Sequence, residues 1–215
     1  MKPVVFAILV AGFTLGCGAN NPAPKPAEKP APAPPSVLHD DDWGRFRSHR
    51  HGLSVPFPDG ESWRIDDTTS LWLDARHPGT SSRLRARAWL EPKPVSRAYC
   101  ESEARRFAPD LPQPDEAGTI DEYETGELFA PDFVSHVVIG LGELAPNTDV
   151  IGGYVLAIGV AGRRCAVLSF TTQVSGGPKA TTVLAERLEI GTRMAENTLF
   201  VSRLPSGPLE PMPTP

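Results

Sequence analysis

The stretch 150-VIGGYVLAIGVAGRRCAVLSFTTQV-174 decides the fold. Val150–Val160 and Cys165–Val174 are rich in Val, Ile, Leu, Phe and Thr, which are residue types that favour β-strands. The pair Ala161-Gly162 lies between them, where a tight turn can join two antiparallel strands. The sequence therefore predicts a β-hairpin, and Phe133–Leu144 predicts another strand before it.

Two segments have the residue spacing of amphipathic helices. The first follows Ser96, a good N-cap residue, and ends at Pro109. The second is Ala180–Leu199. The predicted core face of the first helix holds Cys100, Ala104 and Phe107. The core face of the second holds Leu184, Leu188, Gly191 and Ala195, while its charged residues, Glu186, Arg187, Glu189 and Arg193, lie elsewhere.

Short strands are expected before the first helix. Leu53–Phe57 alternates apolar positions with polar or proline positions, and Leu71–Leu73 and Arg83–Leu90 follow it. Four short strands fit this region. The expected fold is α+β, with an antiparallel sheet of two strand blocks, each followed by a packed helix.

One of these strands carries a family resemblance. The segment Gly52–Gly60, with its Pro58-Asp59-Gly60 turn and the following Trp63, resembles the Mog1/PsbP-like family, as does the order of the elements. The resemblance implies the same α+β topology. It covers topology and this short motif, and no functional residue is carried over from it.

The first residues have the features of an export signal. Met1-Lys2 is a short charged start, and Val4–Leu15 is an apolar run that is too short to span a bilayer. The stretch Thr14-Leu15-Gly16-Cys17 resembles the lipobox of bacterial lipoproteins, although Thr14 and Leu15 stand where that family usually has Leu and a small residue.

The lipobox resemblance implies that residues 1–16 are a signal peptide and that Cys17 becomes a lipidated first residue, which attaches the protein to the membrane. Because Gly18 stands where the inner-membrane retention signal has Asp, the resemblance favours the outer membrane. The alternative is a conventional secretory signal that is cleaved nearby.

Composition divides the rest of the chain. Residues 17–42 hold the cysteine and a Pro/Ala-rich tether with almost nothing to bury, which predicts an extended spacer. Residues 43–204 are expected to form a single α+β domain, and the Pro-rich residues 205–215 are expected to be a disordered tail.

The remaining cysteines suggest a disulfide. With Cys17 lipidated, Cys100 and Cys165 are left in an oxidising compartment, where two thiols make one bridge. Closing such a long loop would stabilise the fold by about 4 kcal/mol in the chain-entropy model. The alternative makes Cys100 a catalytic nucleophile, but no cysteine-protease signature surrounds it.

Charge is distributed unevenly along the chain. The net charge of -5 argues against a generally basic nucleic-acid binder. Residues 43–107 nevertheless hold twelve Lys/Arg against eight Asp/Glu, whereas residues 108–162 hold ten acidic residues and no Lys or Arg. The modest net charge therefore conceals a basic region and an acidic region.

The basic region contains a candidate binding face. Arg83, Arg85 and Arg87 alternate along one predicted strand, so they leave the same face, and Trp89 continues it. The opposite, core face holds Leu84, Ala86, Ala88 and Leu90. Guanidinium groups match carboxylates and phosphates, so this face is a candidate site for an anionic envelope glycan or an acidic protein partner. Alternatively, the acidic run Asp110–Asp132 folds over the arginines, or both faces are simply solvated.

Other motifs are better explained by structure than by chemistry. His49 and His51 would need His77 or Asp74 to make a metal site, and a surface pair is the simpler interpretation. The His39–Asp42 cluster lacks the ligand spacing of a calcium loop. Gly140–Ala145 fits a dinucleotide-binding pattern, but Pro146 prevents the helix that this motif needs directly after it. Four tryptophans could form a sugar platform, although packing is the commoner role: Trp43, Trp63, Trp72 and Trp89.

The leading functional interpretation is a non-enzymatic lipoprotein of the bacterial envelope that acts as a binding or accessory module. One alternative is a hydrolase with an unrecognised Ser/His/Asp site, in which His136, beside Ser135, or His77 would be the base. Another is a structural component of a multiprotein envelope complex. The sequence predicts no metal, cofactor or catalytic residue, and it leaves the oligomeric state open.

Overall fold

The computed structural model describes residues 38, 40–114, 118–141 and 150–201. All of these residues belong to one compact unit, Ala33–Pro215. The predicted signal peptide, Cys17, most of the tether and the Pro-rich tail lie outside the described residues. Leu38 is only 6% exposed and belongs to the core, so packing begins before Trp43, where the domain was expected to start.

The described chain contains two α-helices, α1 (Arg97–Phe107) and α2 (Ala180–Glu196). The strands are β1 (Gly44–Ser48), β2 (Leu53–Phe57), β3 (Arg64–Asp66), β4 (Leu73–His77), β5 (Ser82–Leu90), β6 (Thr119–Thr125), β7 (Val134–Leu141), β8 (Val150–Ala161), β9 (Arg164–Ser175) and β10 (Leu199–Phe200). Helix α1 follows β5, and α2 lies between β9 and β10.

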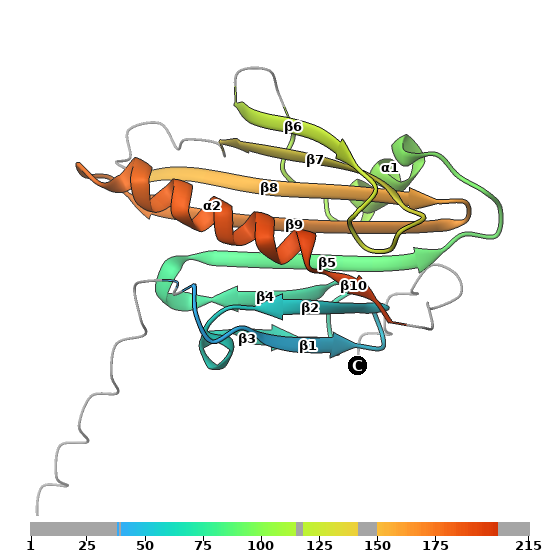
Figure 1. Cartoon of the computed structure of the whole chain (residues 1–215), viewed down its shortest axis with the longest axis horizontal. Coiled ribbons are helices and arrows are strands. Elements are labelled where there is room, and N and C mark those ends of the chain that lie inside the picture. Colours follow the sequence, from blue (N-terminus) through green and yellow to red (C-terminus); the bar gives the residue numbers. More distant parts are fainter. Residues whose placement is uncertain (1–37, 39, 115–117, 142–149, 202–215) are drawn as a thin grey trace, which may run out of the picture. The chain divides into compact units, whose positions relative to one another are not determined.

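These strands form two antiparallel sheets, which gives the expected α+β class (Figure 1). The large sheet has seven strands in the order β3-β4-β5-β9-β8-β7-β6, and the small sheet has the order β1-β2-β10. The expectation of one sheet was therefore wrong, because β1, β2 and β10 pair separately. Strands from both parts of the chain meet in the large sheet, where β5 pairs with β9.

The predicted hairpin is the centre of the large sheet. Strands β8 and β9 pair along their whole length, and Ala161 faces Arg164 in the last pair before the turn. Gly162 has a φ of 58°, a left-handed backbone conformation that glycine adopts without steric cost. The turn residue and the pairing confirm the hairpin that the sequence predicts.

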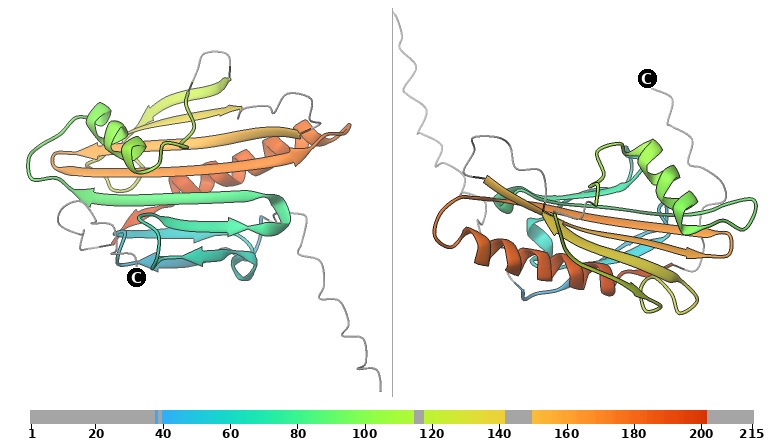
Figure 2. Two further views of the ribbon diagram at one scale, coloured as in Figure 1. Left: turned by 180° about the vertical axis from the view of Figure 1, so that it is seen from behind. Right: turned by 90° about the horizontal axis from the view of Figure 1, so that it is seen from above.

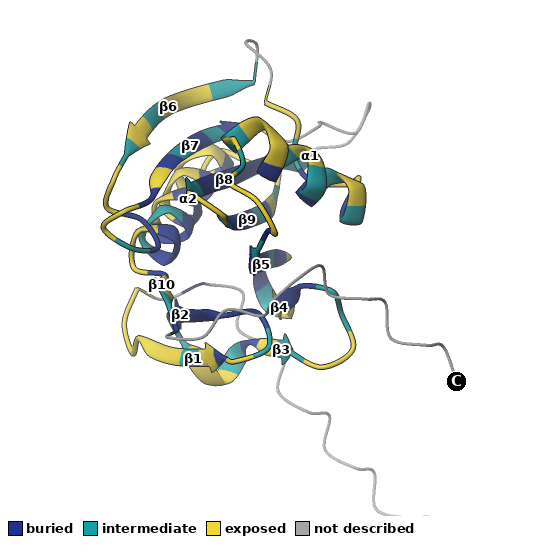
Figure 3. Ribbon diagram, turned by 90° about the vertical axis from the view of Figure 1, so that its right-hand side faces the viewer, coloured by how far each residue is buried: buried dark blue, intermediate teal, exposed yellow. Residues whose placement is uncertain are grey.

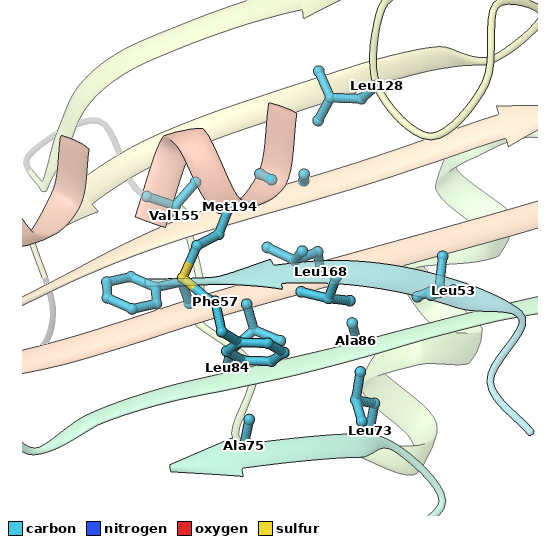
Figure 4. Packing of buried hydrophobic residues seen from close by; sticks show 14 of the residues in the cluster. Leu53, Phe57, Leu73, Ala75, Leu84, Ala86, Leu128, Val155, Leu168 and Met194 are labelled. Carbon is cyan, nitrogen blue, oxygen red and sulfur yellow. The ribbon is translucent and has the colours of Figure 1, made fainter. Parts of the chain in front are cut away.

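The two helices cover opposite faces of the large sheet (Figure 2). One hydrophobic cluster includes residues of α2 and β2 on one side of that sheet, and a second includes residues of α1 on the other. In the first cluster, Phe57 and Leu53 of β2 and Met194 of α2 pack with side chains of the large sheet (Figure 4). Each such fully buried side chain contributes about 1.5–3 kcal/mol to folding, so these contacts hold the layers together.

The predicted helices form with altered ends. The Ser96 hydroxyl accepts a hydrogen bond from the Tyr99 amide, which confirms the N-cap of α1. Helix α2 ends at Glu196, and Leu199 pairs with β2 instead of extending the helix. The predicted core residues of α2 are buried, but so is Arg187, which the sequence placed on the polar face. Neither described helix is long and apolar enough to cross a membrane.

Several strand predictions also differ from the structure. Strand β6 lies within the acidic run Asp110–Asp132, where the sequence indicated no strand, and its backbone pairs with β7. Four strands were expected before α1, and the described residues form five there. The sequence did not locate β1 or β3, and β4 begins at Leu73, where the predicted strand ended. The predicted strand Phe133–Leu144 corresponds to β7, and its end lies outside the described residues.

Candidate anion-binding face

Strand β5 brings the three predicted arginines to one face of the large sheet, as alternation requires. This face also carries α1, because the Arg87 guanidinium lies 4.8 Å from the centre of the Phe107 ring in that helix. Arg85 is only 6% exposed and Arg87 only 2%, whereas the Arg83 side chain is 33% exposed. Of the three arginines of the candidate face, only Arg83 therefore reaches solvent.

Asp110 closes part of this face. It lies just after α1, and its carboxylate accepts a hydrogen bond from Arg85 Nη1 at 2.7 Å. Arg85 Nη2 donates to the Asp110 carbonyl, and Arg83 Nη1 lies 3.7 Å from Asp110 Oδ2. The hydrogen bond from Arg85 holds the pKa of Asp110 below its usual value. One member of the acidic run thus folds over the arginines, as the intramolecular alternative anticipated.

Arg87 is enclosed without a carboxylate contact among the described residues. Its guanidinium lies 5.3 Å from the centre of the Trp89 ring, on the side of the sheet that α1 covers. The Nε and Nη1 atoms are buried and have no hydrogen-bond partner in the described part of the chain. Burial lowers the Arg87 pKa to about 10, so the group keeps its charge at neutral pH. Trp89 donates to Glu91, and neither Arg87 nor Trp89 is accessible to a ligand.

The accessible positive charge lies in a cross-strand row that the sequence did not predict. Arg64 of β3 lies directly opposite Arg76 of β4, and Arg76 lies directly opposite Arg83 of β5. We call these three residues the arginine row. Beside it is an open depression of about 330 Å³, lined by Arg64, Ile65, Asp66, Asp74 and Arg76.

One carboxylate serves two members of the arginine row. Asp74 accepts from Arg83 Nε at 2.9 Å and from Arg83 Nη2 at 2.5 Å, but from Arg76 only at 3.3 Å and 3.5 Å. Burial acts to raise the pKa of Asp74, but the hydrogen bonds from both arginines outweigh it and hold the pKa below its usual value. Arg76 is 63% exposed and is only weakly held.

The other two groups at the depression differ in their partners. The Asp66 carboxylate accepts hydrogen bonds from the side chains and amides of Thr68 and Thr69, which lower its pKa to about 2. Among the described residues, Arg64 has no hydrogen-bond or ion-pair partner. Like charges directly opposite each other on neighbouring strands are unfavourable. Asp66 and Asp74 line the same depression and offset part of this charge, but Arg64 and the exposed Arg76 keep donors available to an external anion.

The structure places the two histidines of the predicted pair, His49 and His51, in different environments. Alternation would put His49 and His51 on one face of a strand, but they lie in the turn between β1 and β2. His49 is exposed, whereas His51 is fully buried, with Nε2 at 3.6 Å from Asp67 Oδ1. The described residues contain no cluster of three or more His, Cys, Asp or Glu side chains that could hold a metal ion.

His77 belongs to a buried chain of polar groups. Its Nδ1 lies 2.9 Å from the Thr80 hydroxyl, which donates to Ser82, and its Nε2 lies 3.7 Å from Asp59 Oδ2. The imidazole, Thr80 and Ser82 are all buried. Burial lowers the pKa of His77. This arrangement places an acid, an imidazole and a hydroxyl in sequence, but the hydroxyls are enclosed and bonded to one another, so they support the fold.

The second candidate base, His136, does not lie beside the side chain of Ser135. Ser135 and His136 are consecutive residues of β7, so their side chains leave opposite faces of the sheet. Ser135 is fully buried, whereas His136 Nε2 lies 2.6 Å from Glu122 of β6. The dinucleotide-like segment begins in β7 at Gly140, and its remainder lies largely outside the described residues.

Three of the four tryptophans are core residues: Trp63, Trp72 and Trp89 are 6%, 4% and 3% exposed. Trp43 differs, because 36% of it is exposed. In the acidic cluster, Asp40 contacts Arg193, whereas His39 lies outside the described residues.

The predicted cysteine pair lies at disulfide distance. The sulfur atoms of Cys100 in α1 and Cys165 in β9 are 2.03 Å apart, and both residues are fully buried. The bridge ties α1 to the centre of the large sheet, on the face that carries Arg85 and Arg87. Cys17 lies outside the described residues.

No protein-family model matches the sequence, and no curated protein matches it. Among solved structures, the chain resembles the solution structure of cyanobacterial PsbP (CyanoP) from Synechocystis sp. PCC 6803. The two share 9% sequence identity with a TM-score of 0.46, over 74% of this chain and 92% of that chain. No site residue and no function follow from this likeness.

Proposed function

We propose that this protein is a binding module of the bacterial envelope, held to a membrane by a lipid on Cys17, and that its ligand is an anionic group carried by an envelope glycan. The observation that carries the proposal is the arginine row. Arg64, Arg76 and Arg83 lie side by side across three strands, and in the described part of the chain Asp74 is the carboxylate that contacts both Arg76 and Arg83.

The chemistry of the depression fits a phosphate or carboxylate. Arg64 and Arg76 line it together, and each guanidinium offers a fork of donors to such a group. Arg83 is already engaged by Asp74, so it supports the row without needing to contact the ligand. An acidic protein partner would need roughly 800 Å² of its surface buried, so this small depression fits a glycan substituent better.

The binding experiment compares two doubly substituted chains. Arg64→Gln with Arg76→Gln should lower affinity for a phosphorylated envelope oligosaccharide at least tenfold in a calorimetric titration, because two charged contacts are lost. Arg47→Gln with Lys93→Gln removes the same charge from two exposed positions outside the row and should change affinity less than twofold. Equal losses in both proteins would mean that only net charge matters, which would sink the proposed site.

The membrane anchor is tested separately. Replacing Cys17 with Ser should move the protein from the membrane fraction to the soluble fraction, since the acyl chains supply the attachment. The cysteine pair at disulfide distance supports export to an oxidising compartment. Persistence of the Cys17→Ser protein in washed membranes would refute the anchor without bearing on the arginine row.

A further inference from the structure

A second depression lies at the start of β1, where the chain enters the domain. It has a volume of about 290 Å³ and is lined by Trp43, Gly44, Arg45, Pro56, Arg193 and Asn197. Strand β1 is largely exposed, as Figure 3 shows by its colour. Trp43 is the most exposed of the four tryptophans, and an indole at a concave surface provides a flat apolar face for a ligand.

Two residues that line the depression, Trp43 and Arg193, contact a carboxylate of the chain itself, that of Asp40, which is not part of the lining. Asp40 Oδ1 accepts a hydrogen bond from the Trp43 indole N–H at 3.1 Å, and Asp40 Oδ2 accepts one from Arg193 Nη1. Arg193 and Trp43 therefore lie close enough for one carboxylate to contact both. Glu189 accepts from Arg193 Nη2 at 2.8 Å and so orients the guanidinium, which leaves Nη1 for the anion.

The hold on Asp40 is weak. The side chains of Asp40 and Arg193 are each 43% exposed, and ion pairs at such exposed positions are readily replaced by other ions. Arg45 keeps the depression positive, while its own Nη2 donates to the Asn197 carbonyl at 2.8 Å. The position of the Asp40 carboxylate is thus one that an external carboxylate can take.

We propose that this depression binds a saccharide that carries a carboxylate, such as a uronic acid. The sugar ring would pack on the Trp43 indole, and its carboxylate would replace that of Asp40 on Arg193 and on the indole N–H. Binding would then free Asp40 from Arg193, which links ligand binding to the attachment of the predicted tether to the domain.

The decisive variant is Asp40→Asn, because it removes the internal competitor and leaves the site intact. Its affinity for a uronic-acid oligosaccharide, measured by tryptophan fluorescence with the full chain in detergent, should rise about two- to fivefold, as expected for loss of an exposed ion pair. Asp41→Asn removes the same charge from the next residue, whose side chain has no hydrogen bond or ion pair among the described residues, and should leave affinity unchanged. Unchanged or weaker binding by Asp40→Asn would overturn the proposal.

Two further variants test the contacts. Arg193→Gln and Trp43→Ala should each weaken binding at least fivefold, with calorimetry as the readout because Trp43→Ala removes the tryptophan that would report binding at this site. A neutral oligosaccharide of equal length should bind at least tenfold more weakly than the uronic-acid oligosaccharide. Acetate should bind no more tightly than the neutral oligosaccharide. Acetate binding as tight as that of the uronic-acid oligosaccharide would rule out recognition of the sugar ring.

The same titrations in the Arg64→Gln, Arg76→Gln protein separate the two sites. Uronic-acid binding at Trp43 should be unchanged there, whereas affinity for the phosphorylated oligosaccharide should fall at least tenfold. Loss of uronic-acid binding in that protein would assign the signal to the arginine row and overturn the second site.

Discussion

Asp74 lies directly opposite Arg85, yet its carboxylate pairs with Arg83, which lies diagonally across the same two strands. The reason is that Arg85 is already engaged by Asp110. Asp74 is therefore free to balance the arginine row, where it holds Arg83 closely and Arg76 loosely. The positions of two carboxylates decide which arginine is left for a ligand.

The Asp74→Asn variant tests this balance. Arg83 and Arg76 would lose their shared counter-ion, so the free energy of unfolding should fall by about 1–3 kcal/mol at pH 7. Because the pKa of Asp74 is held below its usual value, this contribution exists above about pH 4 and is lost as the carboxyl is protonated. Urea unfolding across this pH range measures the loss of stability, and repeating it with phosphate measures how far an external anion replaces the carboxylate. Phosphate should stabilise Asp74→Asn more than the parent protein, and an equal response would contradict the role of Asp74.

Arg85 and Arg87 are neighbours on one strand face, both buried, but they should respond oppositely to substitution by Met. Arg85→Met removes two hydrogen bonds to Asp110 and should lower the free energy of unfolding by about 1–2 kcal/mol. Arg87→Met removes a buried charge that has no carboxylate contact among the described residues, and should be neutral or stabilising by about 1 kcal/mol. A loss above about 2 kcal/mol in Arg87→Met would show that water or an ion satisfies Arg87 in solution.

The arginines show how far the sequence could predict the site. Alternation was enough to place Arg83, Arg85 and Arg87 on one face. It could not show that α1 closes that face, because alternation along one strand carries no information on contacts with distant residues, such as that between Arg87 and Phe107.

The arginine row was harder to find for a related reason. Arg64 and Asp66, and likewise Asp74 and Arg76, have the same two-residue spacing as the β5 arginines. Their strands are short and carry few of the apolar residues that mark a strand. Cross-strand register, which sequence alone did not provide, is what brings Arg64 and Arg76 together.

The hydrophobic periodicity was more informative for the helices and for the central hairpin, where side-chain burial follows from local spacing. It failed at Arg187, whose buried guanidinium donates to the backbone carbonyls of Thr80 and Gln173. An arginine near a core face can bury its methylene groups while its guanidinium donates hydrogen bonds to backbone carbonyls far away in the sequence. No local pattern identifies such partners.

Gly191 offers a prediction in which packing opposes helix propensity. It lies in α2 and is buried, and a Cβ at this position would overlap the ring of Phe170 in β9. Alanine is the better helix former by about 1 kcal/mol, but the overlap should make Gly191→Ala destabilising by about 1–3 kcal/mol. Thr182→Ala, at an exposed position of the same helix, should instead be neutral or slightly stabilising. Thermal unfolding distinguishes them, and adding Phe170→Leu to Gly191→Ala should recover part of the loss.

His51 makes stability depend on pH. Its side chain is fully buried, and both ring nitrogens lack a hydrogen-bond partner in the described part of the chain. Burial, helped by the positive charges of Arg50 and Arg87, lowers its pKa from 6.5 to about 4. The unfolded chain thus takes up a proton near pH 6.5 that the folded protein accepts only near pH 4, so acid favours unfolding in this range.

The stabilising effect of the neutral imidazole is complete above about pH 6.5. Below that pH the free energy of unfolding falls by about 1.4 kcal/mol per pH unit, so the loss at pH 5 is about 2 kcal/mol. His51→Gln cannot take up the proton, so its urea midpoint should fall less between pH 7.5 and pH 5 than that of the parent protein. His49→Gln, at an exposed position of the same turn, should keep the parental slope. Because burial also lowers the pKa of His77, some pH dependence should persist in His51→Gln. Identical slopes in the parent and His51→Gln would mean that water or Asp67 stabilises the protonated ring, and that burial does not keep it neutral.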